Sequence, residues 1–121
     1  MTDEPFNMPS PRIQKHFGIL EYLKDLSPKD QKKFIENSSS ELLKTISEIC
    51  LNLLKGTVKV STSDLKKLKK YKTQIISLSQ KRHSVKERRK LCNQKGGFIG
   101  SLISTLLPVL ISTIVSATQK R

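Results

Sequence analysis

The stretch that decides the fold is residues 41–55, ELLKTISEICLNLLK. Its apolar side chains recur at the spacing of one helix face, namely Leu42, Leu43, Ile46, Ile49, Cys50, Leu53 and Leu54. Three serines, at positions 38–40, come before it as helix start signals, and Gly56 follows it as a helix-ending residue. The pattern predicts a long amphipathic helix whose wide apolar stripe must pack against other helices.

Upstream of this helix, two further helical segments are predicted. Residues 12–26 place Ile13, Phe17, Leu20 and Leu23 at helical spacing. Ser27 and Pro28 then form a cap and a first-turn proline, which predicts a short helix to Asn37.

Downstream, a helix capped by Ser63 is predicted, with an apolar side formed by Leu65, Leu68, Ile75, Ile76 and Leu78. Ser84 is predicted to cap a short basic helix over Val85–Asn93.

These segments predict an all-α fold, because no strand pattern competes with them. Residues 12–93 are interpreted as a small basic bundle of four to five helices. Residues 1–11 are polar and proline-rich, which predicts a disordered arm and no signal peptide. Residues 94–97, Gln-Lys-Gly-Gly, are interpreted as a linker because two glycines free the backbone.

Positive charge is concentrated in one part of the chain. The net charge is +13, and most of it falls between residues 59 and 97. Such a block attracts polyanions, which are DNA, RNA or anionic lipid headgroups; the alternative is a solvated basic surface. The candidate polyanion-binding residues are Lys66, Lys67, Lys69, Lys70, Lys72, Lys81, Arg82, Lys86, Arg88, Arg89 and Lys90.

The segment 98–121 is uncharged until its last two residues, Lys120 and Arg121. On a helical wheel its serines and threonines lie opposite its large apolar residues, and Pro108 is expected to kink it. This predicts an amphipathic, proline-kinked, membrane-active helix. The alternatives are a single transmembrane anchor and a helix that completes the core. The candidate membrane-active residues are Ile99, Leu102, Ile103, Leu106, Leu107, Pro108, Leu110, Ile111 and Ile114.

Two local resemblances support this interpretation. Ile99-Gly100 and the stretch 107–112, LPVLIS, resemble melittin, the bee-venom lytic peptide, although this chain lacks the tryptophan of that peptide. Gln94, Gly96, Gly97 and Phe98 resemble the recognition pattern of adenovirus-type cysteine proteases, which implies cleavage after the second glycine. Such cleavage would separate residues 98–121 from the basic block.

A wider resemblance covers roughly residues 40–110. The run SVKERRK at 84–90, followed by QKGGF at 94–98, looks like a small basic protein of Polinton (Maverick) elements and adintoviruses. The stretch 49–56 and the basic helix 65–72 also fit that group. The resemblance implies a minor virion protein similar in role to adenovirus core precursors and the lytic protein VI. It also implies the viral genome, the capsid protein and the viral protease as partners.

No credible catalytic set is found in the sequence. The chain has two histidines, His16 and His83, and two cysteines at no metal-binding spacing. Cys92 lies near Lys90 and Lys95, which would lower its pKa, but no partner base is apparent. We therefore expect no enzyme activity, cofactor or metal site.

The predicted function is that of a virion maturation protein that uses residues 98–121 to disrupt membranes during entry, while its basic region contacts nucleic acid or capsid. The expected location is the virion, and the host nucleus or cytoplasm before assembly, with membrane association once residues 98–121 are released. One alternative is a nucleic-acid-binding helical module with a C-terminal membrane anchor. A third is an antimicrobial or toxin precursor.

Overall fold

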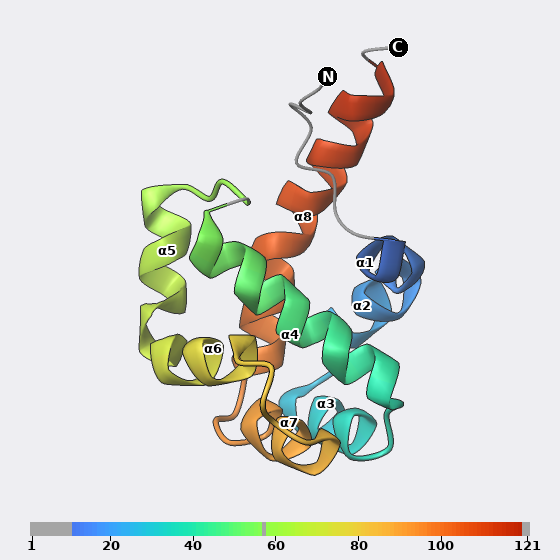
Figure 1. The fold of residues 1–121 in the computed structure, drawn as a ribbon, viewed down its shortest axis with the longest axis vertical. Helices are drawn as coiled ribbons and strands as arrows, with labels where there is room; N and C mark the ends of the chain where they lie inside the picture. Colours follow the sequence, from blue (N-terminus) through green and yellow to red (C-terminus); the bar gives the residue numbers. More distant parts are fainter. Residues whose placement is uncertain (1–10, 57, 120–121) are drawn as a thin grey trace.

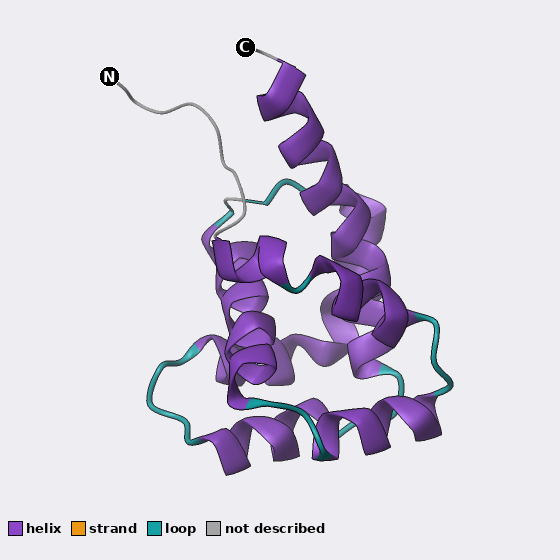
Figure 2. Ribbon diagram, turned by 90° about the vertical axis from the view of Figure 1, so that its right-hand side faces the viewer, coloured by secondary structure: helices purple, strands orange, loops and turns teal. Residues whose placement is uncertain are grey.

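The computed structural model describes residues 11–56 and 58–119, with the side chains of the last helix described as far as Leu110. All regular elements within these residues are helices (Figure 2), which confirms the all-α class. In chain order they are α1 (Pro11–Lys15), α2 (Phe17–Lys24), α3 (Pro28–Glu36), α4 (Ser40–Lys55), α5 (Thr62–Leu68), the 3₁₀ turn η1 (Lys69–Tyr71), α6 (Lys72–Ser79), α7 (Val85–Cys92) and α8 (Phe98–Gln119).

The predicted long amphipathic helix is α4, which crosses the molecule in Figure 1 and packs against α1, α6 and α7. Its start is fixed by the Ser39 hydroxyl, which accepts a hydrogen bond from the Leu42 N–H at 3.2 Å. It ends at Gly56, whose φ of 76° is left-handed. The apolar stripe is buried from Leu42 to Cys50, but Leu54 is 48% exposed.

The long helix α8 supplies a large part of the core. It packs most closely against α2 and also contacts α3 and α5. Its described apolar side chains on one face are buried: Phe98, Ile99, Leu102, Ile103, Leu106, Leu107 and Leu110. The helix continues through Pro108, and its last turns extend beyond the other helices (Figures 1 and 2).

Several predicted boundaries change in the structure. The segment predicted as one helix capped by Ser63 is divided into α5, η1 and α6, and its cap is Ser61, whose hydroxyl accepts from the Asp64 N–H at 3.1 Å. Because a 3₁₀ turn has three residues per turn, η1 shifts the phase of the apolar face. Leu65 and Ile76, both predicted to be buried, are exposed.

The N-terminal prediction is also refined. Residues 12–26 form two helices, α1 and α2, which meet at His16. Pro11, assigned to the predicted arm, is the first residue of α1. The rest of that arm lies outside the described residues.

None of the helices in the described part of the chain combines the length and hydropathy needed to span a membrane.

Candidate polyanion interface

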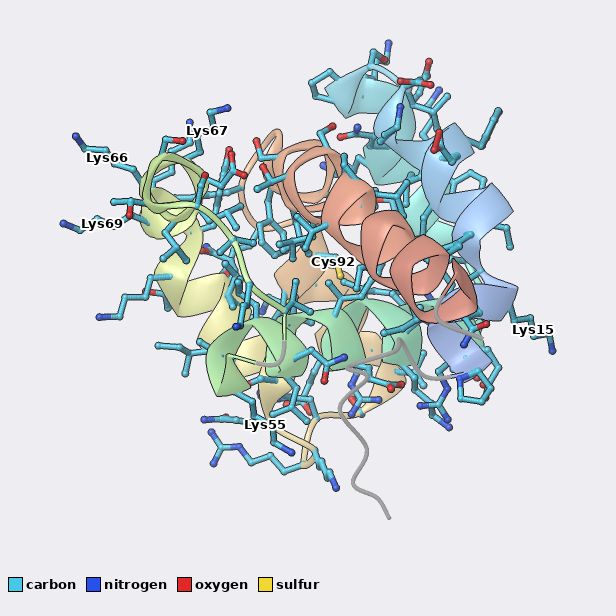
Figure 3. The ribbon with its side chains drawn as sticks, turned by 90° about the horizontal axis from the view of Figure 1, so that it is seen from above. Lys15, Lys55, Lys66, Lys67, Lys69 and Cys92 are labelled. Carbon is cyan, nitrogen blue, oxygen red and sulfur yellow. The ribbon has the colours of Figure 1, made fainter. Side chains whose placement is uncertain are left out.

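Five of the predicted polyanion-binding residues form one exposed surface, which we call the lysine ridge. It consists of Lys66 and Lys67 of α5, Lys69 and Lys70 of η1, and Lys72 at the start of α6. Figure 3 shows Lys66, Lys67 and Lys69 directed away from the rest of the molecule. Within the described residues, the ridge has one ion pair, from Lys67 to Asp64 at 3.8 Å. The ridge therefore presents several cations to solvent.

A polar groove of about 780 Å³ runs along one side of the ridge, between α5 and α8. Lys66, Lys67 and Lys70 line one wall together with Asp64, the ion-pair partner of Lys67. The α8 residues that line the other wall include the hydroxyl-bearing Ser101, Ser104 and Thr105. Ammonium and hydroxyl groups are the donors that proteins use to contact phosphate oxygens. The hydroxyl stripe of α8, predicted from sequence as the polar side of a membrane helix, thus faces lysines in the folded chain.

A second groove, of about 520 Å³, runs along the other side of the ridge and is apolar. We call it the leucine groove. Its lining residues are Leu53, Leu54, Thr62, Leu65, Lys66, Leu68, Lys69, Lys72 and Ile75. The sequence reasoning missed this groove, because helical periodicity identifies apolar residues without showing which of them lack a partner.

The predicted basic residues around α7 are arranged differently. Arg88 is 8% exposed, with a guanidinium N–H directed at the Lys81 carbonyl at 3.5 Å. Arg89 donates to the Ser38 carbonyl at 2.5 Å. The other members, Lys81, Arg82, Lys86 and Lys90, are exposed. Figure 1 shows α7 at the lower end of the molecule and α5 at its upper side, so these residues lie apart from the α5 lysines of the ridge, although α6 packs against α7.

The predicted cleavage segment forms a turn beside the ridge. Gln94 and Gly96 are exposed, whereas Gly97 is half-buried with a φ of 83°. The Lys95 ammonium donates to the Lys70 carbonyl at 2.9 Å. Phe98 is fully buried, with its ring centre 5.3 Å from that of Tyr71. A protease that binds an extended strand would have to open this turn locally.

The predicted lowering of the Cys92 pKa is wrong. Cys92 is 1% exposed, and burial raises its pKa to about 12, against the smaller opposing effect of Arg88. The lysines expected to stabilise its thiolate, Lys90 and Lys95, are both exposed, and Figure 3 places the Cys92 sulfur inside the molecule. No cluster of metal-ligating side chains occurs among the residues with a described placement.

The structure also places the other predicted site residues. Of the membrane-active set, those from Ile99 to Leu110 are buried except Pro108, which is exposed. The side chains of Ile111 and Ile114 lie outside the described part. Comparison with protein-family models, curated proteins and solved structures finds no match for this chain.

Proposed function

We propose that this chain is a minor virion protein whose lysine ridge binds nucleic acid and whose helix α8 is a membrane-active helix kept latent by packing. One observation supports this above others. The α8 face that would enter a bilayer is the face buried in the core, through residues such as Leu102, Leu106 and Leu110. In this arrangement the intact chain withholds the apolar surface that membrane insertion needs.

The energy of this packing determines how α8 is released. Full burial of a large apolar side chain contributes about 1.5–3 kcal/mol, and α8 has seven buried ones among its described residues. Their combined contribution, roughly 10–20 kcal/mol, is as large as the net stability of a typical domain, about 5–15 kcal/mol. Release of α8 is therefore expected to accompany opening of the whole core rather than to precede it.

Cleavage after Gly97 would favour release by a simple electrostatic effect. It would leave a protonated amine on Phe98, a residue that is fully buried. The Phe98 nitrogen has one acceptor, the Lys95 carbonyl at 3.3 Å, but burial of an ammonium without a counter-ion is costly. The nearby cations, Lys70 and Lys95, both within 6 Å of the Tyr71 ring that packs on Phe98, would add like-charge repulsion.

Nucleic acid would act in the opposite direction. A phosphate held in the polar groove would contact lysines of α5 and hydroxyls of α8 together, such as Lys67 and Ser104. A ligand that binds only the packed state stabilises that state. In this proposal the bound genome keeps α8 packed, and loss of the genome contact makes release easier.

Dye release from liposomes tests the proposal. We expect strong leakage from a synthetic peptide of residues 98–121 and little from the intact chain. Ile46→Ala in the fully buried centre of α4 should increase leakage by the intact chain, because such a cavity costs about 2–5 kcal/mol. Ile76→Ala is the matched control, because Ile76 is 37% exposed.

Each outcome has a distinct meaning. Equal leakage from the intact chain and the peptide would contradict latency. An inactive peptide would remove the membrane role and leave nucleic-acid binding as the function. Added duplex DNA should reduce leakage by the Ile46→Ala chain if the polar groove links α5 to α8.

A further inference from the structure

We propose that the leucine groove binds a single-chain anionic lipid, with the alkyl chain on its leucines and the acid group held by Lys66, Lys69 and Lys72. This inference goes beyond the proposed function, because it requires neither release of α8 nor nucleic acid. It rests on the apolar floor, the cationic rim and the size of the groove.

The floor of the groove is apolar and comes from three separate segments. Leu68 at the end of α5 and Ile75 of α6 are each 3% exposed. Leu54 at the end of α4 and Leu65 of α5 are each 48% exposed, so the groove leaves about half of two leucines in water. An alkyl chain laid between them would remove that surface from water, which is favourable in proportion to the area covered.

The rim of the groove is cationic. Besides the apolar residues, its lining contains Thr62 and three lysines, and no carboxylate. The lysine stems can extend along apolar surface while their ammonium groups stay in water. An occupant with an apolar body and an anionic end matches both features. Two copies of this chain paired groove to groove do not, because their lysines would face one another.

The volume of the groove suits a small amphipathic molecule. The groove measures about 520 Å³. Small-molecule sites occupy about 300–1,000 Å³, a range that includes this groove.

The test is calorimetric titration of the full chain with octanoate, decanoate and dodecanoate below their micelle concentrations. Each buried methylene should tighten binding about fourfold, so the affinity should rise steeply along the series at a stoichiometry near one. Methyl NMR should locate the change at Leu54, Leu65 and Leu68. Decyl maltoside, which has a similar chain and no charge, should bind much more weakly.

Two pairs of variants make the test specific. Leu54→Ser with Leu65→Ser should abolish the dependence on chain length, whereas Ile19→Ser with Ile76→Ser should not, because these isoleucines are exposed outside the groove. Changing Lys66, Lys69 and Lys72 to Gln should weaken binding at least tenfold. The same change at Lys29, Lys32 and Lys33, exposed on α3, should have little effect.

Four results would overturn the proposal: an affinity independent of chain length, equal binding of the maltoside, equal losses in the control variants, or methyl shifts away from the groove. Binding of an acidic amphipathic peptide at the leucine groove without binding of dodecanoate would assign the groove to a protein partner instead. DNA binding provides an independent reference. The leucine variants should retain it in full, so failure of the lipid proposal leaves the proposed function intact.

Discussion

Two basic segments of this chain look alike in sequence and differ in the fold. The α5–η1 segment presents its lysines to solvent, as Figure 3 shows for Lys66, Lys67 and Lys69. In α7, the Arg89 guanidinium instead reaches a backbone carbonyl 51 residues away, at Ser38. Similar local charge therefore gives an open cationic surface in α5–η1. In α7 it gives an internal hydrogen bond from Arg89 to the Ser38 carbonyl, which we call the Arg89 clasp.

The difference follows from the chemistry of the two cationic side chains. Lysine is a strongly hydrated point charge on a flexible stem, whereas arginine is a planar, weakly hydrated fork with five donors. Arginine is therefore better suited to a partly buried carbonyl. The α7 region has a further link of this kind, from the Asn93 side-chain amide to the Lys32 carbonyl at 3.3 Å. These contacts fasten α7 to α3 and to the start of α4.

The largest effect is expected on nucleic-acid affinity at the ridge. Changing Lys66, Lys67 and Lys70 to Gln should make the slope of log affinity against log salt shallower by roughly one per lysine, because fewer counterions are released. Stability should fall by about 1 kcal/mol at most, since all three lysines are exposed and the Lys67–Asp64 ion pair lies at the surface. Fluorescence anisotropy with a DNA duplex measures the slope.

The matched control for this experiment changes three exposed cations of the α7 region, Lys81, Lys86 and Lys90, to Gln. A loss of slope as large as that of the ridge variant would show that the two segments bind nucleic acid alike. Nucleic-acid binding would then not be a property of the lysine ridge alone.

The second effect is on stability. Arg89→Ala should lower the free energy of unfolding by about 1.5–3 kcal/mol, because it removes a charge-assisted hydrogen bond and leaves the buried Ser38 carbonyl without this partner. Urea denaturation measures the loss. Lys90→Ala, one position along on an exposed site, should stay within about 0.5 kcal/mol of the parent. Equal losses of stability in the two variants would contradict a structural role for the Arg89 clasp.

A smaller effect is expected at the helix starts. Ser84→Ala should cost about 1 kcal/mol, because Ser84 belongs to a capping box. Its hydroxyl accepts from the Glu87 N–H at 3.1 Å, and its N–H donates to the Glu87 carboxylate at 2.8 Å. Ser61→Ala, at the single-sided cap of α5, should cost less. If thermal denaturation shows a larger loss of stability for Ser61→Ala than for Ser84→Ala, the stronger role of the capping box is contradicted.

The same capping box predicts a pH dependence. The Ser84 N–H holds the pKa of Glu87 below its ordinary 4.5. Because the folded-state pKa is depressed, the stabilisation is present above pH 4.5 and is lost as the pH falls through the lower folded value. Glu87→Gln should flatten the loss of stability on acidification below pH 4.5.

The parts of this fold that the sequence predicts well are those decided by local interactions. The buried stripe of α4, the caps at Ser27 and Ser84, and the stop at Gly56 each depend on residues within one or two turns. The cap of α5 was misplaced by two residues because Thr62 and Ser63 offer the same hydroxyl chemistry as Ser61.

The parts that the sequence leaves open depend on distant partners. An amphipathic pattern such as that of α8 suits a bilayer interface and a protein core equally, so its contact with α2 is not encoded locally. Charge counting likewise marks Arg89 as a ligand-binding cation, because the carbonyl that it reaches is 51 residues away. The polar groove joins α5 to α8, and no local pattern places them side by side.

The smallest effect is expected at Cys92, a buried residue whose reactivity reports whether α7 stays packed. Burial raises its folded pKa from 9.0 to about 12. The stabilisation that this implies is complete below pH 9 and is lost as the pH rises toward 12, because the unfolded chain releases the proton first.

At about pH 8, iodoacetamide should modify Cys92 in the native chain far more slowly than in the urea-unfolded chain, as mass spectrometry can measure. Arg89→Ala should speed the reaction by allowing α7 to open, while the ridge variant should not. Fast modification of Cys92 in the native parent chain would contradict the claim that the Arg89 clasp keeps α7 packed. It would mean that α7 opens without any change to its arginines.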